Sequence, residues 1–146
     1  MTGVAIYLVT DDRGVGYPDE WDERVVDLVA FVEDERGVLV LGTPGGSRIV
    51  SMVLLGLLDY LHNPDWTLDG MVAAPRFHHQ FLPDRVEIEP EGFPVAWRTA
   101  LESRGHTVAV ARRRWGNMQA VYVERASGHN RAAADPRGRV EAPAGY

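Results

Sequence analysis

Two adjacent glycines, Gly45 and Gly46, stand where a buried strand is expected to give way to a helix. The apolar run 38–41 is typical of a strand, and the length and spacing of 47–61 predict a helix. Glycines at such a junction allow positive φ, and N–H groups at a helix start have no intrahelical acceptor. These amides could therefore hold a negatively charged oxygen. The alternative is a purely structural turn with Ser47 as helix N-cap, since the Gly-Lys-Ser/Thr of a phosphate loop is absent.

The adjacent histidines His78 and His79 are the other residues that invite a chemical interpretation. A zinc site is disfavoured, because neighbours in an extended segment point to opposite sides and no HExxH motif or third ligand accompanies them. A triad of Asp135, a histidine and Ser47 has no support from spacing. With no cysteine in the chain, thiolate catalysis and disulfides are excluded. We expect structural histidines and predict neither a metal nor a cofactor.

The composition is that of one ordinary globular domain of 146 residues, with 45% hydrophobic and 25% charged residues. A net charge of -6 disfavours nonspecific attraction to nucleic acid or anionic lipid. The one basic run, 112–114, is expected to be a solvated strand end. The longest apolar stretch, 49–61, is shorter than the ~20 residues of a membrane span. We therefore expect no nucleic-acid partner and no membrane span.

Two elements are expected before the glycine pair. Residues 4–9 form an apolar strand, and the acidic residues after Pro18 suit the first turn of a helix. The apolar side of that helix consists of Val25, Val26, Leu28, Val29 and Val32. A hairpin with its turn at 34–37 then leads into the strand 38–41, which is apolar throughout, so both its faces should be covered.

After the glycine pair, the helix over 47–61 is expected to bury one apolar face and to pack closely at Gly56. That face comprises Ile49, Val50, Val53, Leu54, Leu57, Leu58 and Leu61. A second helix is capped by Thr67 and stopped by Pro75.

The last third of the chain alternates in a strand-like manner. Residues 85–89 form a strand with Val86 and Ile88 inward, and a helix runs from Pro94 to a C-cap at Gly105. Two alternating segments, 106–111 and 118–123, are expected to pair antiparallel. A short edge strand follows at 131–134.

Four motifs together resemble one known family. The segments TPGGSRI (43–49), AAPRFHHQ (73–80), DPR (135–137) and AGY (144–146) are similar, in this order, to the C-terminal part of the small subunit of γ-glutamyltransferases, also called glutathione hydrolases. The resemblance covers 31–146. We therefore expect a divergent N-terminal segment, 1–30, followed by the C-terminal region of a γ-glutamyltransferase small subunit, 31–146.

The resemblance implies an α+β fold that is part of the N-terminal-nucleophile hydrolase αββα sandwich, with a mainly antiparallel sheet and packed helices. It implies that the backbone N–H groups of Gly45 and Gly46 serve as oxyanion donors. In that family an autocatalytic cut frees a threonine nucleophile, which would lie upstream of the residues present here. None of the internal threonines carries the family's surrounding motif, and 25–29 replace a serine-rich segment of its substrate pocket.

These features leave two alternative functions. The chain transfers or hydrolyses γ-glutamyl groups of compounds such as glutathione only if the nucleophile-bearing part is supplied, with the large-subunit region as a candidate partner. The alternative is a catalytically inactive remnant or a stand-alone binding module, so enzymatic activity stays open. The apolar start has no basic n-region and is not a signal peptide. This leaves the localisation unassigned, cytoplasmic by default, although the family is often periplasmic or secreted.

Overall fold

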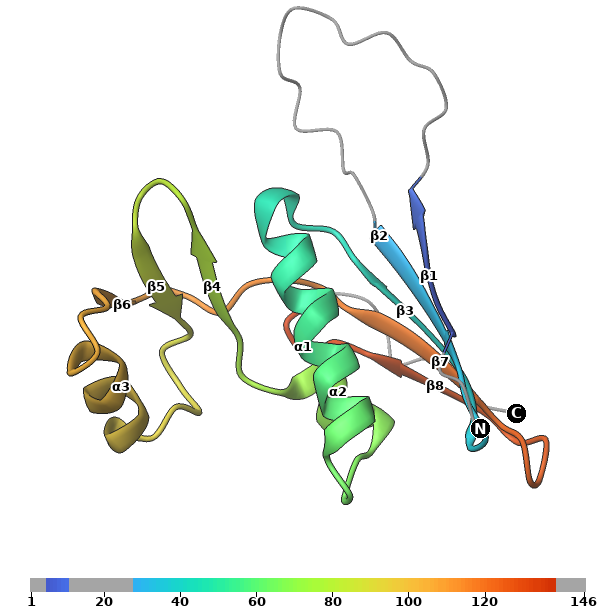
Figure 1. Ribbon diagram of the computed structural model, residues 1–146. Helices are drawn as coiled ribbons and strands as arrows, with labels where there is room; N and C mark the ends of the chain where they lie inside the picture. Colours follow the sequence, from blue (N-terminus) through green and yellow to red (C-terminus); the bar gives the residue numbers. More distant parts are fainter. Residues whose placement is uncertain (1–4, 11–27, 139–146) are drawn as a thin grey trace, which may run out of the picture.

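The computed structural model describes residues 5–10 and 28–138, which form two sheets with helices beside them (Figure 1). The larger sheet is antiparallel and has the strand order β1-β2-β3-β7-β8. Its strands are β1 (Ala5–Thr10), β2 (Leu28–Glu33), β3 (Gly37–Thr43), β7 (Gln119–Glu124) and β8 (Asn130–Ala134).

The smaller sheet has the order β4-β5-β6, in which β4 and β5 are antiparallel and β5 and β6 are parallel. Its strands are β4 (Phe77–Gln80), β5 (Arg85–Ile88) and β6 (Val108–Val110). The helices are a short 3-10 turn η1 (Gly46–Arg48) and the α-helices α1 (Ile49–His62), α2 (Leu68–Ala73) and α3 (Val95–Glu102). None of the helices in the described ranges is long and apolar enough to cross a membrane.

Helix α1 covers one face of the larger sheet together with α2 (Figure 1). Its buried residues recur at three- and four-residue steps, the spacing of a helix on a flat surface: Ile49, Met52, Val53, Gly56, Leu57 and Tyr60. The expected close packing at Gly56 is confirmed, because an added Cβ would lie 2.7 Å from Leu41 Cδ1. The prediction was wrong for Val50, Leu54 and Leu58, which are exposed. A helix that is apolar around most of its circumference does not reveal which side meets the sheet, and the side found here is the one that carries Gly56.

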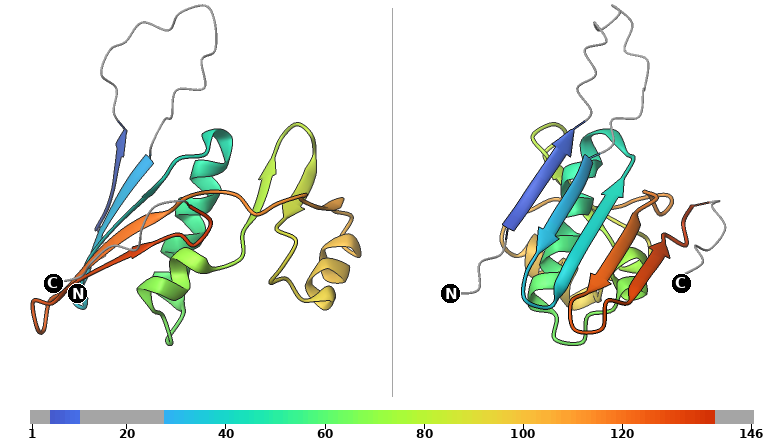
Figure 2. Two further views of the ribbon diagram at one scale, coloured as in Figure 1. Left: turned by 180° about the vertical axis from the view of Figure 1, so that it is seen from behind. Right: turned by 90° about the vertical axis from the view of Figure 1, so that its right-hand side faces the viewer.

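The other face of the larger sheet carries no helix or strand of the described ranges, as the right-hand view of Figure 2 shows. Along β3, Leu39 and Leu41 are buried beneath the helices, whereas Val38 and Val40 point the other way and are half-buried. On the neighbouring strand, Val121 and Val123 are 45% and 37% exposed. Both faces of β3 were expected to be covered. Among the described residues, only the face toward the helices is covered.

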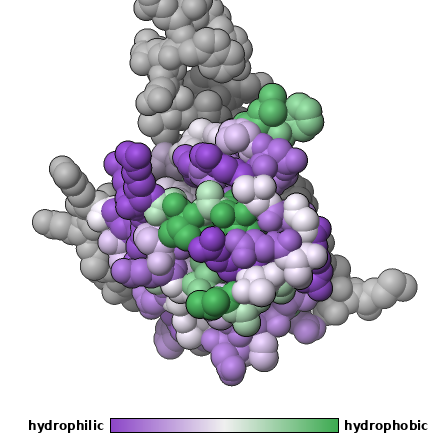
Figure 3. Space-filling model, turned by 90° about the vertical axis from the view of Figure 1, so that its left-hand side faces the viewer, coloured by the Kyte–Doolittle hydropathy of each residue, from purple (hydrophilic) through white to green (hydrophobic). Residues whose placement is uncertain are grey.

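The smaller sheet builds a core of its own. Val86, Ile88 and Val108 are buried, and they are packed by Phe77, Phe93, Trp97 and Leu101. Figure 3 views the molecule from this side, where hydrophilic residues surround a central apolar patch. The predicted inward direction of Val86 and Ile88 is confirmed.

The antiparallel pairing expected between 106–111 and 118–123 is wrong. Strand β6 pairs in parallel with β5, and β7 lies between β3 and β8 in the other sheet. Residues 111–118, the crossing segment, run from one sheet to the other, because Val108 completes the small core beside Val86 and Ile88. Short alternating segments do not specify their partners, so sequence proximity misled the interpretation.

The helix expected after Pro18 is also wrong where it can be compared. Residues 11–27 lie outside the described part, and Leu28–Glu33 form strand β2. Its backbone pairs with β1 and β3, and Ala30 and Val32 are fully buried under α1. The boundary expected after residue 30 falls within this strand. The strand near the N-terminus, the Thr67 cap of α2 and the edge strand β8 are confirmed.

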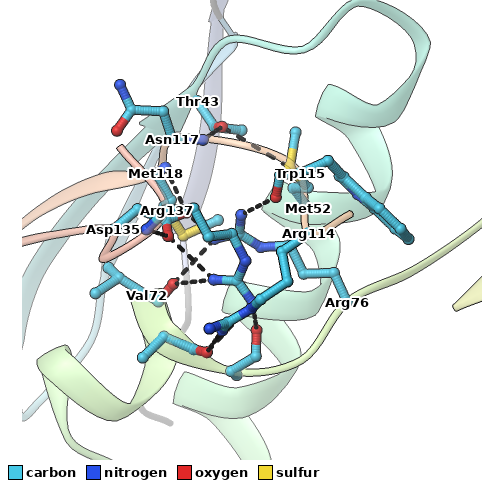
Figure 4. A network of polar contacts seen from close by, with 12 residues as sticks. Thr43, Met52, Val72, Arg76, Arg114, Trp115, Asn117, Met118, Asp135 and Arg137 are labelled. Atoms are coloured by element: carbon cyan, nitrogen blue, oxygen red, sulfur yellow. Dashed lines mark hydrogen bonds and ion pairs between the residues drawn. The ribbon is translucent and has the colours of Figure 1, made fainter. Parts of the chain in front are cut away.

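A buried ionic network joins the two sheets, and Figure 4 shows its part around Arg76, Asp135 and Arg137. Arg137, which follows β8, places Nη2 2.5 Å from Glu89 Oε2, just beyond β5. Its Nη1 lies 3.0 Å from Asp135 Oδ1, and Asp135 Oδ2 lies 2.6 Å from Nη2 of Arg76. These four side chains are at most 4% exposed. Charges buried to this extent are tolerated only when paired and hydrogen-bonded.

Backbone groups complete the network. The carboxylate of Glu89 accepts hydrogen bonds from the N–H of Arg76 at 3.1 Å and of Trp115 at 2.9 Å. The Arg137 guanidinium donates to the carbonyls of Val72, Ala73 and Ala74 at the end of α2. One cluster thus fixes α2, the end of β5, the crossing segment and the end of β8 relative to one another.

Asp135 should make the fold sensitive to acid. Its burial would raise the pKa of the carboxyl group, but hydrogen bonds from the N–H groups of Arg137 and Met118, with the charge of Arg76, hold that pKa below its usual value. A carboxylate with a depressed folded-state pKa contributes stability above its unfolded value of about 4. That contribution is lost as the pH falls from about 4 toward the folded-state pKa.

Leu57 and Leu54 test which side of α1 faces the sheet. Leu57 is 8% exposed and Leu54 is 52% exposed, three residues apart on one helix. Leu57→Ala should lower the free energy of unfolding by about 2–5 kcal/mol, because it leaves a cavity, whereas Leu54→Ala should cost under about 0.5 kcal/mol. Urea unfolding measures both. Equal losses would contradict the orientation of α1.

Asp135→Asn tests the network. At pH 7 the variant should lose about 3–5 kcal/mol of unfolding free energy, because Arg76 loses the carboxylate that it pairs with and Arg137 keeps only Glu89. The difference from the unaltered chain should shrink as the pH falls from about 4 toward the lower folded-state pKa of Asp135. Urea unfolding across this pH range measures it, with exposed Asp65→Asn as the control. A difference independent of pH would contradict the role of the Asp135 charge.

Candidate functional site

The turn from β3 into α1 requires both of its glycines. Gly45 has φ 149° and Gly46 has φ 57°, values in the range that favours glycine. The turn closes when the N–H of Arg48 donates to the Gly45 carbonyl at 3.2 Å and that of Ile49 donates to the Gly46 carbonyl. The alternative of Ser47 as N-cap is wrong, because Gly45 and Arg48 occupy the cap positions of η1 and α1 and neither makes a side-chain cap bond.

The N–H groups of Gly45 and Gly46 have no protein acceptor among residues 5–10 and 28–138. Both glycines are exposed. A Cβ on Gly46 would meet no atom within 4 Å, whereas one on Gly45 would lie 2.7 Å from Met52 Cε. Two unpaired donors therefore lie at the open start of α1, where the helix dipole also favours negative charge.

Thr43 anchors the turn from beneath. It is buried at the end of β3, where its hydroxyl donates to the Pro44 carbonyl at 3.0 Å and accepts from the N–H of Asn117 at 3.4 Å. The adjacent Trp115 carbonyl accepts from Arg76 Nη1 at 2.7 Å (Figure 4). The crossing segment thus connects the turn to the ionic network, so the network positions the glycines.

A cavity of about 240 Å³ adjoins the turn. It is lined by Ser47, Arg48, His78, Gln80, Pro83, Arg85 and Glu87. At its wall, His78 is held between Ser51 Oγ, 2.8 Å from Nδ1, and Gln80 Oε1, 3.0 Å from Nε2. Gly45 and Gly46 are not among the lining residues, so the cavity begins one residue beyond the unpaired donors.

The histidines have separate partners. His79 lies 2.9 Å from Asp84 Oδ1, on the far side of β4 from His78. No group of three His, Cys, Asp or Glu side chains that could hold a metal ion occurs in the described ranges. Asp135 is paired with arginines in the network, so the combination with Ser47 and a histidine is not assembled.

Glu87 carries the negative charge of the cavity wall. Its Oε2 lies 2.6 Å from Arg48 Nη2 and its Oε1 lies 2.7 Å from Arg85 Nη2. Hydrogen bonds from Arg48 and then from Arg85 lower the pKa of Glu87 despite its partial burial. The carboxylate is therefore ionised at neutral pH and fixes both guanidinium groups.

Sequence reasoning missed the residues that position this site. The motifs 73–80 and 135–137 were recognised through resemblance, but the ion pairs of Arg76, Asp135 and Arg137 were not predicted. Glu89 gave no signal, because an acid at the end of an alternating strand is usually solvated. Its burial is compensated by an ion pair with Arg137, 48 positions away along the chain, and by hydrogen bonds from the backbone N–H groups of Arg76 and Trp115, 13 and 26 positions away.

Comparisons with known proteins point to one family. Residues 27–145 match the family described as Gamma-glutamyltranspeptidase. The glutathione hydrolase proenzyme of Escherichia coli K12 is 38% identical over 141 residues, covering 95% of this chain and 23% of that protein. An alignment of this extent reaches into the first thirty residues, where no motif was recognised.

Comparison with solved structures points to the same family. The γ-glutamyltranspeptidase of Pseudomonas nitroreducens, complexed with L-DON, has a TM-score of 0.61 at 30% identity, covering 99% of this chain and 63% of that one. The Helicobacter pylori γ-glutamyltranspeptidase T380A mutant has a TM-score of 0.63 at 33% identity, covering 68% of this chain and 54% of that one.

The chain spans about a quarter or less of the first curated relatives it matches, 23%, 13% and 19% of their lengths. Within that part, the α+β arrangement with a mainly antiparallel sheet and packed helices is that of the N-terminal-nucleophile hydrolases among these neighbours. The chain belongs to the γ-glutamyltranspeptidase family.

Proposed function

We propose that this chain supplies the oxyanion-binding part of a site that transfers or hydrolyses γ-glutamyl groups, and that it acts only when a nucleophile-bearing part is supplied. The observation that carries this proposal is the pair of N–H groups at Gly45 and Gly46 without an acceptor in the described ranges. A donor already paired within the protein could not receive developing charge, whereas these two can.

The chemistry requires such donors at one moment. When a hydroxyl attacks the γ-carbonyl carbon, its proton passes to a base and the carbonyl oxygen becomes an oxyanion. Backbone N–H groups aimed at that oxygen lower the barrier, and loss of one good donor typically costs ~3–4 kcal/mol. The substrate class follows from the family, whose curated relatives are glutathione hydrolases.

The uncovered face of the larger sheet supports a partner. Val121 and Val123 are exposed there beside the half-buried Val38 and Val40, with which they pair across the strands. A sheet face of this composition is stabilised when a second layer covers it. We infer that the remainder of the family's fold, including its large-subunit region, covers this face in an active assembly.

A catalytically inactive remnant or a stand-alone binding module is the second candidate. What favours it is the absence of a threonine that the motifs assign as nucleophile. Internal threonines such as Thr43 have their amino groups in peptide bonds, so they lack the free α-amine that serves as base in this mechanism.

The 146-residue chain alone should not hydrolyse a γ-glutamyl anilide. Release of the coloured aniline measures turnover directly. Processing of Met1 would expose Thr2, so Thr2→Ala is measured in parallel. Turnover that disappears in Thr2→Ala would contradict the expectation and assign the nucleophile to Thr2.

Complementation tests the proposed function itself. The chain is mixed or co-expressed with the Escherichia coli relative truncated before its matching segment. Restored turnover is expected, because the truncated partner supplies the nucleophile and covers the sheet face. A stable complex without turnover would favour the inactive remnant, and no complex would contradict the inferred partner.

In the complemented enzyme, Gly46→Val should reduce turnover per folded molecule by about 100-fold or more, because a β-branched residue displaces an oxyanion donor. Gly128→Val is the matched control: it also has positive φ, 71°, and open space around its Cβ. Both should lose about 1–3 kcal/mol of stability through backbone strain. Equal turnover in the two variants would assign Gly46 to architecture alone.

A further inference from the structure

A groove of about 530 Å³ runs along the smaller sheet beside the start of α1. Its size is within the range of sites that bind small molecules. It is lined by Arg48, Arg85, Glu87, Ala109, Val110, Ala111, Arg112, Arg113 and Trp115. The basic run 112–114, which the sequence predicts to be a solvated strand end, thus contributes two of its three arginines to this groove.

The groove is positively charged in a negatively charged chain. Four arginines and one glutamate give its lining a charge of +3, against -6 for the whole sequence. Glu87 pairs with Arg48 and Arg85, but Arg112 and Arg113 are exposed and have no ion pair or hydrogen bond with any described residue. A local field of this sign concentrates anions.

Unpaired donors also occur within the groove's wall. Arg48 Nε and Trp115 Nε1 are buried without a hydrogen-bond partner in the described part, and the Arg48 guanidinium lies 5.2 Å from the Trp115 ring centre. Buried donors without acceptors are rare in native proteins. With the exposed Arg112 and Arg113, these donors give the wall an excess of donors over acceptors.

The groove is continuous with the candidate site. Arg48, Arg85 and Glu87 line both the groove and the cavity that begins at Ser47. Arg48 belongs to the same 3-10 turn as Gly46. A peptide whose scissile carbonyl lies at Gly46 would therefore extend its leaving-group side, about 7 Å for two extended residues, along this continuous space toward the groove.

We propose that this arginine groove binds the terminal carboxylate of the peptide on the leaving-group side of the γ-glutamyl bond, an inference that rests on the proposed function. Planar guanidinium groups bind carboxylates through two parallel hydrogen bonds. The α-carboxylate of the γ-glutamyl group suits the groove less well. It has an ammonium group on the same carbon, which Arg112 and Arg113 repel.

Binding to the full chain tests the inference without any turnover. Three probes are titrated in separate NMR experiments: N-acetylglycylglycine, its C-terminal amide, and glutamate. The Trp115 indole and the amides of Ala109 and Ala111 should respond to the free-carboxylate peptide. The amide and glutamate should bind at least ten-fold more weakly.

A matched pair of double variants distinguishes the loss of the groove arginines from the loss of positive charge in general. Arg112→Ala/Arg113→Ala should weaken binding of N-acetylglycylglycine at least five-fold with unchanged urea unfolding, since neither arginine has a described partner. Arg104→Ala/Arg131→Ala removes the same charge from exposed positions outside both cavities and should change affinity less than two-fold. Equal losses in the two variants would overturn the inference.

Further outcomes of these experiments would overturn the proposed carboxylate site. Equal binding of the amide probe, or shifts confined to residues outside the groove, would overturn the carboxylate site. Tighter binding of glutamate would assign the groove to the γ-glutamyl end instead and overturn the inference as stated. In the complemented enzyme, KM for glutathione should rise at least five-fold in Arg112→Ala/Arg113→Ala. An unchanged KM overturns the inference alone, whereas selective binding without turnover in any complemented enzyme overturns the proposed function alone.

Discussion

The pairing of Glu89 and Asp135 with Arg76 and Arg137 is the interaction on which the rest of the structure depends. The two sheets share no strand, and each has its own apolar core. Their relative position is fixed by this cluster and the backbone groups it binds, together with the contacts of Ser51 with His78 and of Arg48 with Glu87. The carboxylates of Glu89 and Asp135 accept directional hydrogen bonds from the segment next to Asn117, whose N–H donates to Thr43 below the glycine turn.

The sequence predicted the fold where local periodicity is sufficient. The helix after the glycine pair, the Thr67 cap and the hairpin leading to β3 follow from spacing and turn residues alone. The partners of β6 and β7 could not be predicted this way, because a three-residue strand carries too little pattern to specify a neighbour. The sheet-facing side of α1 was ambiguous for a related reason: its surface is apolar around most of its circumference.

The candidate site was predictable in part: the sequence indicates local backbone conformation but not burial that depends on tertiary contacts. A glycine pair between a strand and a helix implies positive φ, and Gly45 and Gly46 both show it. Nothing in a linear pattern indicates that Glu89 is buried, since its burial depends on arginines that only tertiary structure brings to it. Resemblance located Arg76 and Arg137 without a role, and the network supplies that role.

The structure fixes the start of α1 and leaves one face of the larger sheet open among the described residues. It holds the start of α1 rigidly, because Thr43 below the turn is tied to the crossing segment and hence to the network. Rigid placement is what an oxyanion donor requires, since its benefit comes from not reorganising during the reaction. Yet no helix or strand of the described ranges covers the face of the sheet that carries the exposed valines. Preformed donors beside an uncovered apolar sheet face fit the proposed part of a larger catalytic domain, whereas a protein selected only for binding would gain solubility by replacing Val121 and Val123 with polar residues.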